Sequence, residues 1–243
     1  LLDRFKLGGG RLLDLEYLTD DTGRRVAAFG YWAGYAGAAV SLMCWMAQQQ
    51  GKVMGPVRAV PTQAALLTDL RGAMAGVTAP PPSALIIGAL GRVGTGAADL
   101  CRDMGVGTTL WDMAETASGG PFPEILAHEL FFNCILARPG TPVFVPASAK
   151  TAERQLSVIG DIACDPDSDF SPIKVYDRVT TWDAPALRVH DAPVLDVTAI
   201  DNLPSLMPLE SSADFAAQLL PHLAAPGSDV WARASKLFDQ AIA

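Results

Sequence analysis

One segment of the chain reads Ile86-Ile87-Gly88-Ala89-Leu90-Gly91-Arg92-Val93-Gly94-Thr95-Gly96-Ala97-Ala98. It follows the continuous apolar run 84–87, which is typical of a strand buried on both faces of a parallel sheet. Glycines after such a strand let the backbone turn tightly and approach a pyrophosphate, whose oxygens are bound by N–H groups at the start of the next helix. Residues 97–104 supply that helix. The spacing is a variant of the strict GxGxxG pattern, and it predicts a dinucleotide-binding loop.

An acidic residue at the end of the next expected strand extends this pattern. Residues 108–111 form that strand, and Asp112 follows it about twenty residues after the glycines, where such an acid is expected. A carboxylate there can accept hydrogen bonds from both adenosine ribose hydroxyls and would repel the 2′-phosphate of NADP. Asp112 could also simply cap the next turn. The order of strand, glycines, helix, strand and acid favours NAD binding.

Further strands and helices alternate on both sides of this segment. We expect strands at 130–136, 142–145, 157–163 and 194–197, and helices at 61–74, 211–223 and 230–242. Alternating strands and helices predict an α/β fold with a Rossmann-like, doubly wound parallel sheet.

The N-terminal part differs in character. Residues 12–18 alternate apolar and polar, 19–23 have turn chemistry, and 24–29 resume an extended pattern, so a β-hairpin is expected. Residues 26–51 then include no charged side chain after Arg25. That run is long enough to span a membrane, and it is equally consistent with a buried helix against which other backbones pack closely.

Composition excludes some classes of protein. Half of the 243 residues are apolar and the net charge is −8, with no Lys/Arg cluster for a nucleic-acid backbone. The four cysteines form no CxxC pair and lack metal-ligand spacing. We therefore expect reduced thiols in a cytoplasmic protein, no metal, no nucleic acid, and small molecules or protein subunits as partners.

Several segments together resemble the family of NAD-dependent, lysine-forming saccharopine dehydrogenases, in the alanine dehydrogenase and transhydrogenase-like superfamily. They occur in order and are Asp14–Leu18, Gly23–Gly30, Tyr31–Ala39, Leu85–Arg92, Trp111–Asp112, Glu115–Thr116, Gly119–Phe122, Asn133–Ile135 and Ile200–Leu206. The resemblance implies two Rossmann-like domains and no membrane span. Residues 30–203 would be the dinucleotide-binding domain. Residues 1–29 and 204–243, the hairpin and the C-terminal helices, would be a remnant of the substrate and catalytic domain.

The resemblance also implies site residues. NAD would be bound by residues on both sides of the glycine loop: Arg24, Gly88, Gly91, Arg92, Gly94, Asp112, Thr116, Ile162, Ile200, Asp201 and Leu203. Saccharopine, which gives lysine and 2-oxoglutarate, would be bound by Arg25, Phe29, Ala163, Cys164 and Asp165. The catalytic Lys and His of the family lie upstream of the expected hairpin. No position of this chain matches them, so we expect a truncated chain that is inactive alone.

Two positions depart from the family pattern. Val93 stands where some members carry a Cys, and Leu136 stands where a Tyr is familiar. A related amino-acid dehydrogenase and a non-catalytic NAD-binding module remain alternative interpretations, and the sequence predicts no oligomeric state.

Overall fold

The computed structural model describes residues 1–242 and divides into two compact units. The sheet unit comprises Gly30–Pro208. The small unit comprises Leu1–Phe29 and the segment that begins at Leu209.

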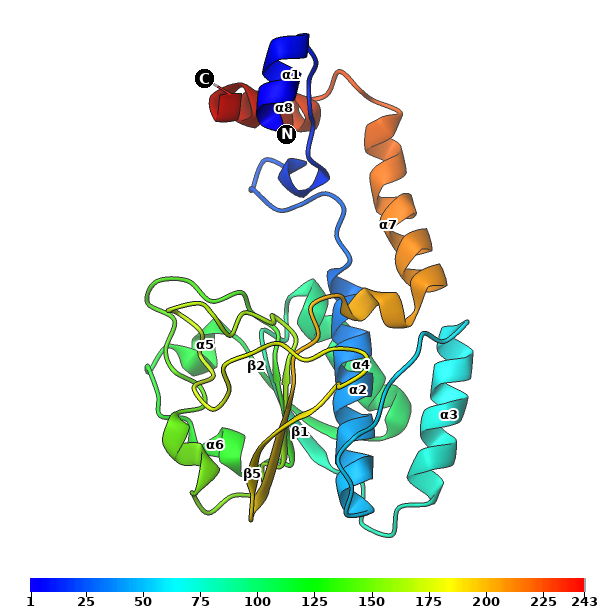
Figure 1. Ribbon diagram of the computed structural model, residues 1–243, viewed down its shortest axis with the longest axis vertical. Helices are drawn as coiled ribbons and strands as arrows, with labels where there is room; N and C mark the ends of the chain where they lie inside the picture. The colour runs from blue at the N-terminus through cyan, green and yellow to red at the C-terminus, as the bar shows by residue number, and fades with distance from the viewer. Residues whose placement is uncertain (243) are drawn as a thin grey trace. The chain divides into compact units, whose positions relative to one another are not determined.

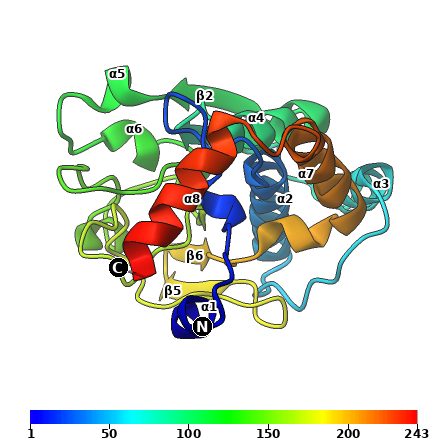
Figure 2. The ribbon, with the colours of Figure 1, turned by 90° about the horizontal axis from the view of Figure 1, so that it is seen from above.

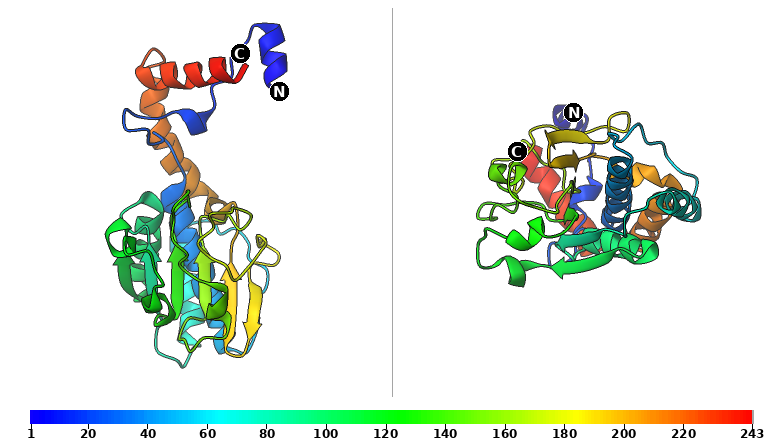
Figure 3. Two further views of the ribbon diagram at one scale, coloured as in Figure 1. Left: turned by 90° about the vertical axis from the view of Figure 1, so that its left-hand side faces the viewer. Right: turned by 90° about the horizontal axis from the view of Figure 1, so that it is seen from below.

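A six-stranded, mostly parallel sheet forms the centre of the sheet unit (Figures 1 and 3). Its strands are β1 (Ser83–Ile87), β2 (Gly107–Trp111), β3 (Leu130–Asn133), β4 (Val158–Asp161), β5 (Leu187–Asp191) and β6 (Val194–Thr198). Their order is β2-β1-β3-β4-β6-β5, and only the β5–β6 pair is antiparallel. The predicted α/β fold with a mainly parallel sheet is confirmed.

One predicted strand is absent, and one strand of the sheet was not predicted. Residues 142–145 form no strand, and Val145 makes only an isolated bridge to Ile173. The reason is that the N–H groups of Phe144 and Val145 both donate to the carbonyl of Pro172 instead of to a strand ladder. Conversely, β5 was not predicted, because this edge strand is only half-buried and mixes charged with apolar residues.

Helices α2 (Gly30–Gln49) and α4 (Arg92–Met104) lie against one face of the sheet, and α3 (Gln63–Ala75) packs on the outer side of these two helices. Ile86 and Phe132 point into this layer. The opposite face carries the short helices α5 (Met113–Thr116) and α6 (Pro123–Leu126), a 3₁₀ helix at Ala147–Lys150, and loops. Leu85 and Phe131 point into that second core. Because β1 and β3 are buried on both faces, their residues 84–87 and 130–132 are continuously apolar.

The long uncharged segment forms α2, a core helix. Its residues 34–42 and 44–46 are buried, mostly under the sheet and α4. Within residues 1–242, no helix has both the length and the apolar character needed to cross a membrane.

Helices α2 and α4 touch through their backbones and lie side by side in Figure 2. A Cβ atom built on Gly34 would lie 1.8 Å from the carbonyl oxygen of Val93. In the reverse direction, a Cβ on Gly96 would lie 1.9 Å from the carbonyl oxygen of Tyr31. Either distance is far below van der Waals contact, so this approach requires glycine on both helices.

The small unit is helical. It contains α1 (Leu2–Gly8), a 3₁₀ helix at Leu15–Tyr17, most of α7 (Pro208–Leu223), and α8 (Asp229–Ile242). Leu18 is fully buried against Val230 and Ala234 of α8.

The predicted hairpin in this unit is reduced to a reversal of the chain without strands, in which Val26 N–H donates to the Leu18 carbonyl and Asp20 N–H to the Arg24 carbonyl. Among the described residues of 12–29 there is only a single bridge, between Thr19 and Arg25. Acidic side chains capture the backbone N–H groups that a strand ladder would need. Asp14 accepts from the N–H of Glu16 at 2.9 Å, and Asp20 accepts from the N–H groups of Thr22 and Arg24. Such local bonds favour turns over strands.

We expect Gly34→Ala to lower the free energy of unfolding by about 2 kcal/mol or more, because the new methyl must displace backbone atoms of α4. Gly72→Ala in α3 is the matched control, since a Cβ there meets nothing within 4 Å. It should raise stability by about 0.5–1 kcal/mol, as alanine does in a helix interior. Urea unfolding followed by circular dichroism measures both. Equal stability of the two variants would contradict the close contact.

Candidate cofactor site

The glycine loop after β1 is packed so closely that two of its positions exclude a side chain. Gly88 has a φ of +88°, and a Cβ there would lie 2.6 Å from Ile135 Cγ2 and 3.0 Å from the carbonyl oxygen of Cys134. A Cβ on Gly94 would lie 2.2 Å from the carbonyl oxygen of Gly88. The loop therefore rests against the end of β3 on one side and on the first turn of α4 on the other.

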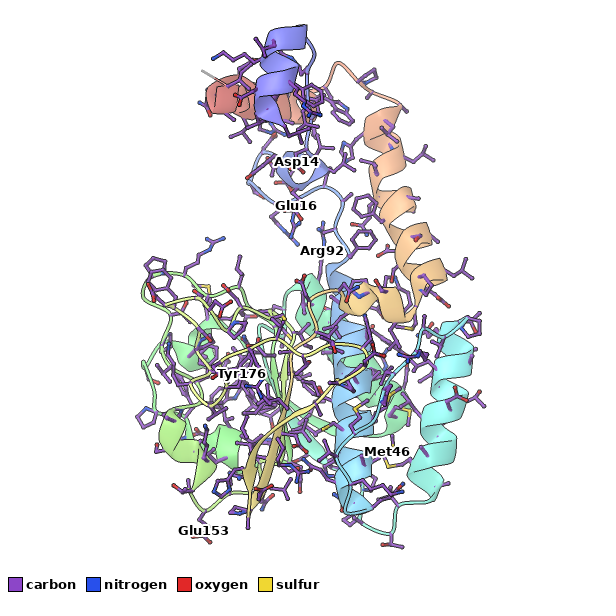
Figure 4. All side chains as sticks on the ribbon, in the orientation of Figure 1. Asp14, Glu16, Met46, Arg92, Glu153 and Tyr176 are labelled. Carbon is purple, nitrogen blue, oxygen red and sulfur yellow. The ribbon has the colours of Figure 1, made fainter. Side chains whose placement is uncertain are left out.

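The start of α4 has no side-chain cap. Gly91 is the N-cap residue and carries no side chain, so the first backbone N–H groups of the helix receive no acceptor from it. These groups and the positive end of the helix dipole form a binding site for an anion such as a pyrophosphate. Arg92, the first residue of the helix, lies near the first turn of α2 (Figure 4). This geometry fits a dinucleotide.

Asp112 connects β2 to the same loop. Its Oδ2 accepts a hydrogen bond from the N–H of Leu90 at 3.1 Å. Its Oδ1 accepts from the N–H of Met113 at 2.9 Å, and Glu115 completes a capping box at the start of α5. The hydroxyl of Thr116 donates to the main-chain carbonyl of Asp112 at 3.0 Å. The carboxylate thus does cap a helix. Its oxygens retain lone pairs that could accept hydrogen bonds from ribose hydroxyls.

The strand order places this loop at a switch point. From β1 the chain passes to β2 on one side and then returns to β3 on the other side. Ligands of open α/β sheets bind outside the carboxyl ends of the strands at such a point. A dinucleotide bound there would have one mononucleotide half on the β1–β2 side, with Asp112, and the other half at the ends of β3 and β4.

The ends of β3 and β4 carry a polar network that the sequence did not reveal. Asp161 is 2% exposed and accepts from Asn133 Nδ2 at 2.9 Å, from the hydroxyl of Tyr176 at 2.6 Å and from the N–H of Cys164 at 3.3 Å. Burial raises the pKa of the Asp161 carboxyl, and the hydrogen bonds from Tyr176 and Asn133 oppose that rise. The sequence held one indication of this network. Asn133 and Asp161 each end a buried strand, and the carboxyl ends of parallel strands lie at the same edge of a sheet.

The segment after β4 turns sharply at this edge. Cys164 has a φ of +54°, which is rare for a residue with a side chain, and its thiol donates to the carbonyl of Ala199 at 3.1 Å. Ala163 and Asp165 flank it and are partly exposed, as required of residues that could contact a substrate.

Three of the expected cofactor residues have buried side chains. Ile162, Ile200 and Leu203 are 9%, 2% and 4% exposed and pack into the core beside α2. A contact with a cofactor would therefore go mainly through their main chain. Asp201 is exposed.

The remaining expected residues, Arg24, Arg25 and Phe29, belong to the small unit. Arg25 forms an ion pair with Glu16 at 3.0 Å, and both side chains are largely exposed. Phe29 stacks on Phe215 with ring centroids 4.4 Å apart. Glu16 is labelled in Figure 4.

In residues 1–242, the structure brings no three His, Cys, Asp or Glu side chains together in a group that could hold a metal ion.

The fold and the loop define a Rossmann-type dinucleotide-binding protein. The chain is similar in fold to an L-alanine dehydrogenase, with a TM-score of 0.56 and 19% identity over 87% of this chain and 57% of that one. No family model matches the chain. Individual relatives of known name do match the chain.

The saccharopine dehydrogenase [NAD(+), L-lysine-forming] of Neurospora crassa is 44% identical over 258 residues, which cover 100% of this chain and 69% of the relative. The enzymes of the same name from Candida glabrata and Candida albicans are 42% and 40% identical, over 99% and 100% of this chain and 69% and 70% of their own lengths. The chain belongs to the family of NAD-dependent, lysine-forming saccharopine dehydrogenases.

We expect the cysteines of the native protein to resist alkylation. Burial raises the pKa of Cys101 and of Cys164 to about 12, and only the thiolate reacts. At pH 8, iodoacetamide should therefore label both thiols on the order of a thousandfold more slowly in the native protein than in urea. Peptide mass mapping over time measures the rates. Labelling of native Cys164 at a rate near that of the unfolded chain would contradict the burial of its thiol.

Proposed function

We propose that this chain supplies the NAD-binding part, and a share of the substrate site, of an enzyme that oxidises saccharopine to L-lysine and 2-oxoglutarate. The observation that carries the proposal is the identity of 44% along the whole chain to an enzyme named for this activity and for NAD(+). The glycine loop, the uncapped start of α4 and the acid at the end of β2 support the cofactor assignment independently.

A bound NAD would supply the hydride acceptor for the carbon next to the secondary amine of saccharopine. The chain's own contribution is to bind and orient. The main chain of Gly88, Gly91 and Gly94 would approach the pyrophosphate, Arg92 would lie beside it, and Asp112 with Thr116 would face the adenosine ribose. Holding the reactants in one geometry is itself a large part of catalysis.

The functional division proposed for the chain follows the expected one. Residues 30–203 would be the dinucleotide-binding domain, and 1–29 with 204–243 would belong to the substrate domain. Arg25 and Phe29 would then contact saccharopine, together with Ala163, Cys164 and Asp165, whereas Arg24 would contact NAD. Saccharopine, lysine and 2-oxoglutarate are the proposed small-molecule partners, and we propose a cytoplasmic location. We assign no residue of this chain as the acid or the base.

NAD should bind more tightly than NADP, because the Asp112 carboxylate would repel a 2′-phosphate. In Asp112→Ala, the loss of a charge-assisted hydrogen bond should weaken NAD binding by about 1.5–3 kcal/mol, roughly ten- to a hundredfold. NADP binding should weaken less or improve. Calorimetry with both cofactors measures this.

Glu115→Gln is the control for the NAD experiment. It perturbs the capping box and leaves the Asp112 carboxylate in place. If the parent chain binds NADP as well as NAD, or if the two variants behave alike, the assignment of Asp112 to the ribose fails.

Arg25→Lys should weaken saccharopine binding far more than NAD binding. A guanidinium binds a carboxylate with two parallel hydrogen bonds that an ammonium does not reproduce. The expected loss is about 1.5–3 kcal/mol. The existing pair with the exposed Glu16 is no obstacle, since surface ion pairs contribute only about 0–1 kcal/mol.

Arg24→Lys serves as the paired variant and should affect NAD more than saccharopine. Calorimetric titration of each ligand into each variant gives the four affinities. Equal effects on both ligands would show that the two arginines are only a solvated surface, and the proposed roles would be abandoned.

A further inference from the structure

A hollow beside β5 is lined mainly by basic side chains. It has a volume of about 260 Å³, lies within the sheet unit, and is at the edge of the sheet opposite to β2. Its charged lining residues are Lys150 of the 3₁₀ helix, Lys174, Asp177 and Arg178 of the loop before β5, and Arg188 of β5 itself. The fold, and not a run of basic residues in the sequence, brings these four cations together.

Three of the four cations have no close acidic partner. In residues 1–242, the ammonium group of Lys150 meets no acceptor. Lys174 Nζ donates only to the main-chain carbonyl of Asp169, at 3.4 Å. Arg178 has only the adjacent carboxylate of Asp177, at 3.6 Å, and both of these side chains are largely exposed. Together with Asp177, the three cations therefore leave two positive charges unbalanced.

Arginines elsewhere in the chain are paired more closely. Arg11, Arg58, Arg102 and Arg233 each contact an aspartate at 2.6–3.0 Å. Unbalanced cations in one hollow are therefore unusual in a chain whose net charge is −8. A concave surface lined by charges of one sign focuses the electric field and raises the local concentration of counter-ions.

The main chain at the hollow adds hydrogen-bond donors. Tyr176, labelled in Figure 4, and Asp177 both line the hollow, and within the described chain their N–H groups donate to no protein acceptor. Backbone N–H groups in folded proteins are ordinarily paired. Successive free N–H groups beside cations are suited to binding the oxygens of an anion.

We propose that this hollow binds a small anion that carries at least two negative charges, of the phosphate or polycarboxylate class. A dianion would balance the two unpaired positive charges. The volume lies below the about 300–1,000 Å³ that is typical of pockets for larger ligands, which favours a small molecule over a nucleotide. Lys and Arg side chains bind both phosphate and carboxylate groups. This inference does not depend on the binding of NAD at the glycine loop.

The test is a calorimetric titration of the full chain with inorganic phosphate and with citrate, at constant ionic strength and with NAD present. At least one of them should bind saturably, and singly charged acetate should bind at least about tenfold more weakly, because it lacks the second screened charge interaction. Acetate that binds as tightly would contradict the proposed requirement for two charges.

Variants locate the binding site. The double variant Lys150→Gln, Lys174→Gln should weaken binding of the anion at least about tenfold, because two screened charge interactions are lost. The double variant Lys52→Gln, Lys236→Gln is the matched control. It changes the net charge equally at two exposed lysines that do not line the hollow, so it should leave the affinity unchanged.

Lysine acylation provides a second measurement that needs no variant. A bound anion should protect the ammonium groups of Lys150 and Lys174 from acetylation, and leave Lys52 and Lys236 unprotected. At an anion concentration ten times the dissociation constant, occupancy predicts about tenfold slower acetylation of the first two. Peptide mass spectrometry over time measures the four rates.

The outcomes are distinct. Preferential binding of phosphate or of citrate supports the inference and identifies the class of anion. Absence of saturable binding of either anion would overturn it. Binding that the two double variants weaken equally, or that neither weakens, would place the anion elsewhere, for example at the glycine loop, and would overturn it as well. Uniform acetylation rates with and without the anion would have the same meaning.

Discussion

The close contact between α2 and α4 is the constraint on which the sheet unit depends. Gly34 and Gly96 let two backbones meet without intervening side chains. Helix α4 is thereby fixed at its first turns, where the dinucleotide loop enters it, and Gly94 holds the same turns against Gly88. Protein interiors are close-packed and deform little, so a helix held at this end presents its N–H groups in one place. The placing of these N–H groups thus depends on helix packing as much as on the loop itself.

Charge is arranged on the two sides of this packed centre in different ways. On the β2 side, Asp112 uses its carboxylate to hold the loop and to cap α5. On the β4 side, Asp161 is enclosed by neutral donors, while Asp196, farther along the sheet, is neutralised by Arg188. The three carboxylates of Asp112, Asp161 and Asp196, in or next to one sheet, are therefore stabilised by three different kinds of partner. Their environments, and not their residue type, determine what each can do.

The sequence predicted those features that local chemistry determines. The apolar run of β1, the glycines and Asp112 are contiguous signals, and the structure brings the loop and Asp112 within a hydrogen bond. The hairpin stops at a single antiparallel bridge because Asp14 and Asp20 bind nearby N–H groups, a competition that alternation of polarity does not reveal. The Asp161 network escaped notice because its side-chain partners are 28 and 15 residues away and meet only through sheet order and a loop.

The hydrogen bonds of Asp112 to the loop and to α5, together with its proposed contact with the ribose, bear on how the protein could evolve. A pocket for a 2′-phosphate would require that this carboxylate be exchanged for a neutral or basic group. The same exchange would release the N–H of Leu90 and uncap α5, so the loop would lose order at the moment the pocket changed. If Asp112 does face the ribose as proposed, a change of coenzyme at this position would be easier after substitutions elsewhere had stabilised the loop. In mutational terms, any effect of position 112 on the coenzyme would be coupled to its effect on the stability of the loop, so the two would not add independently.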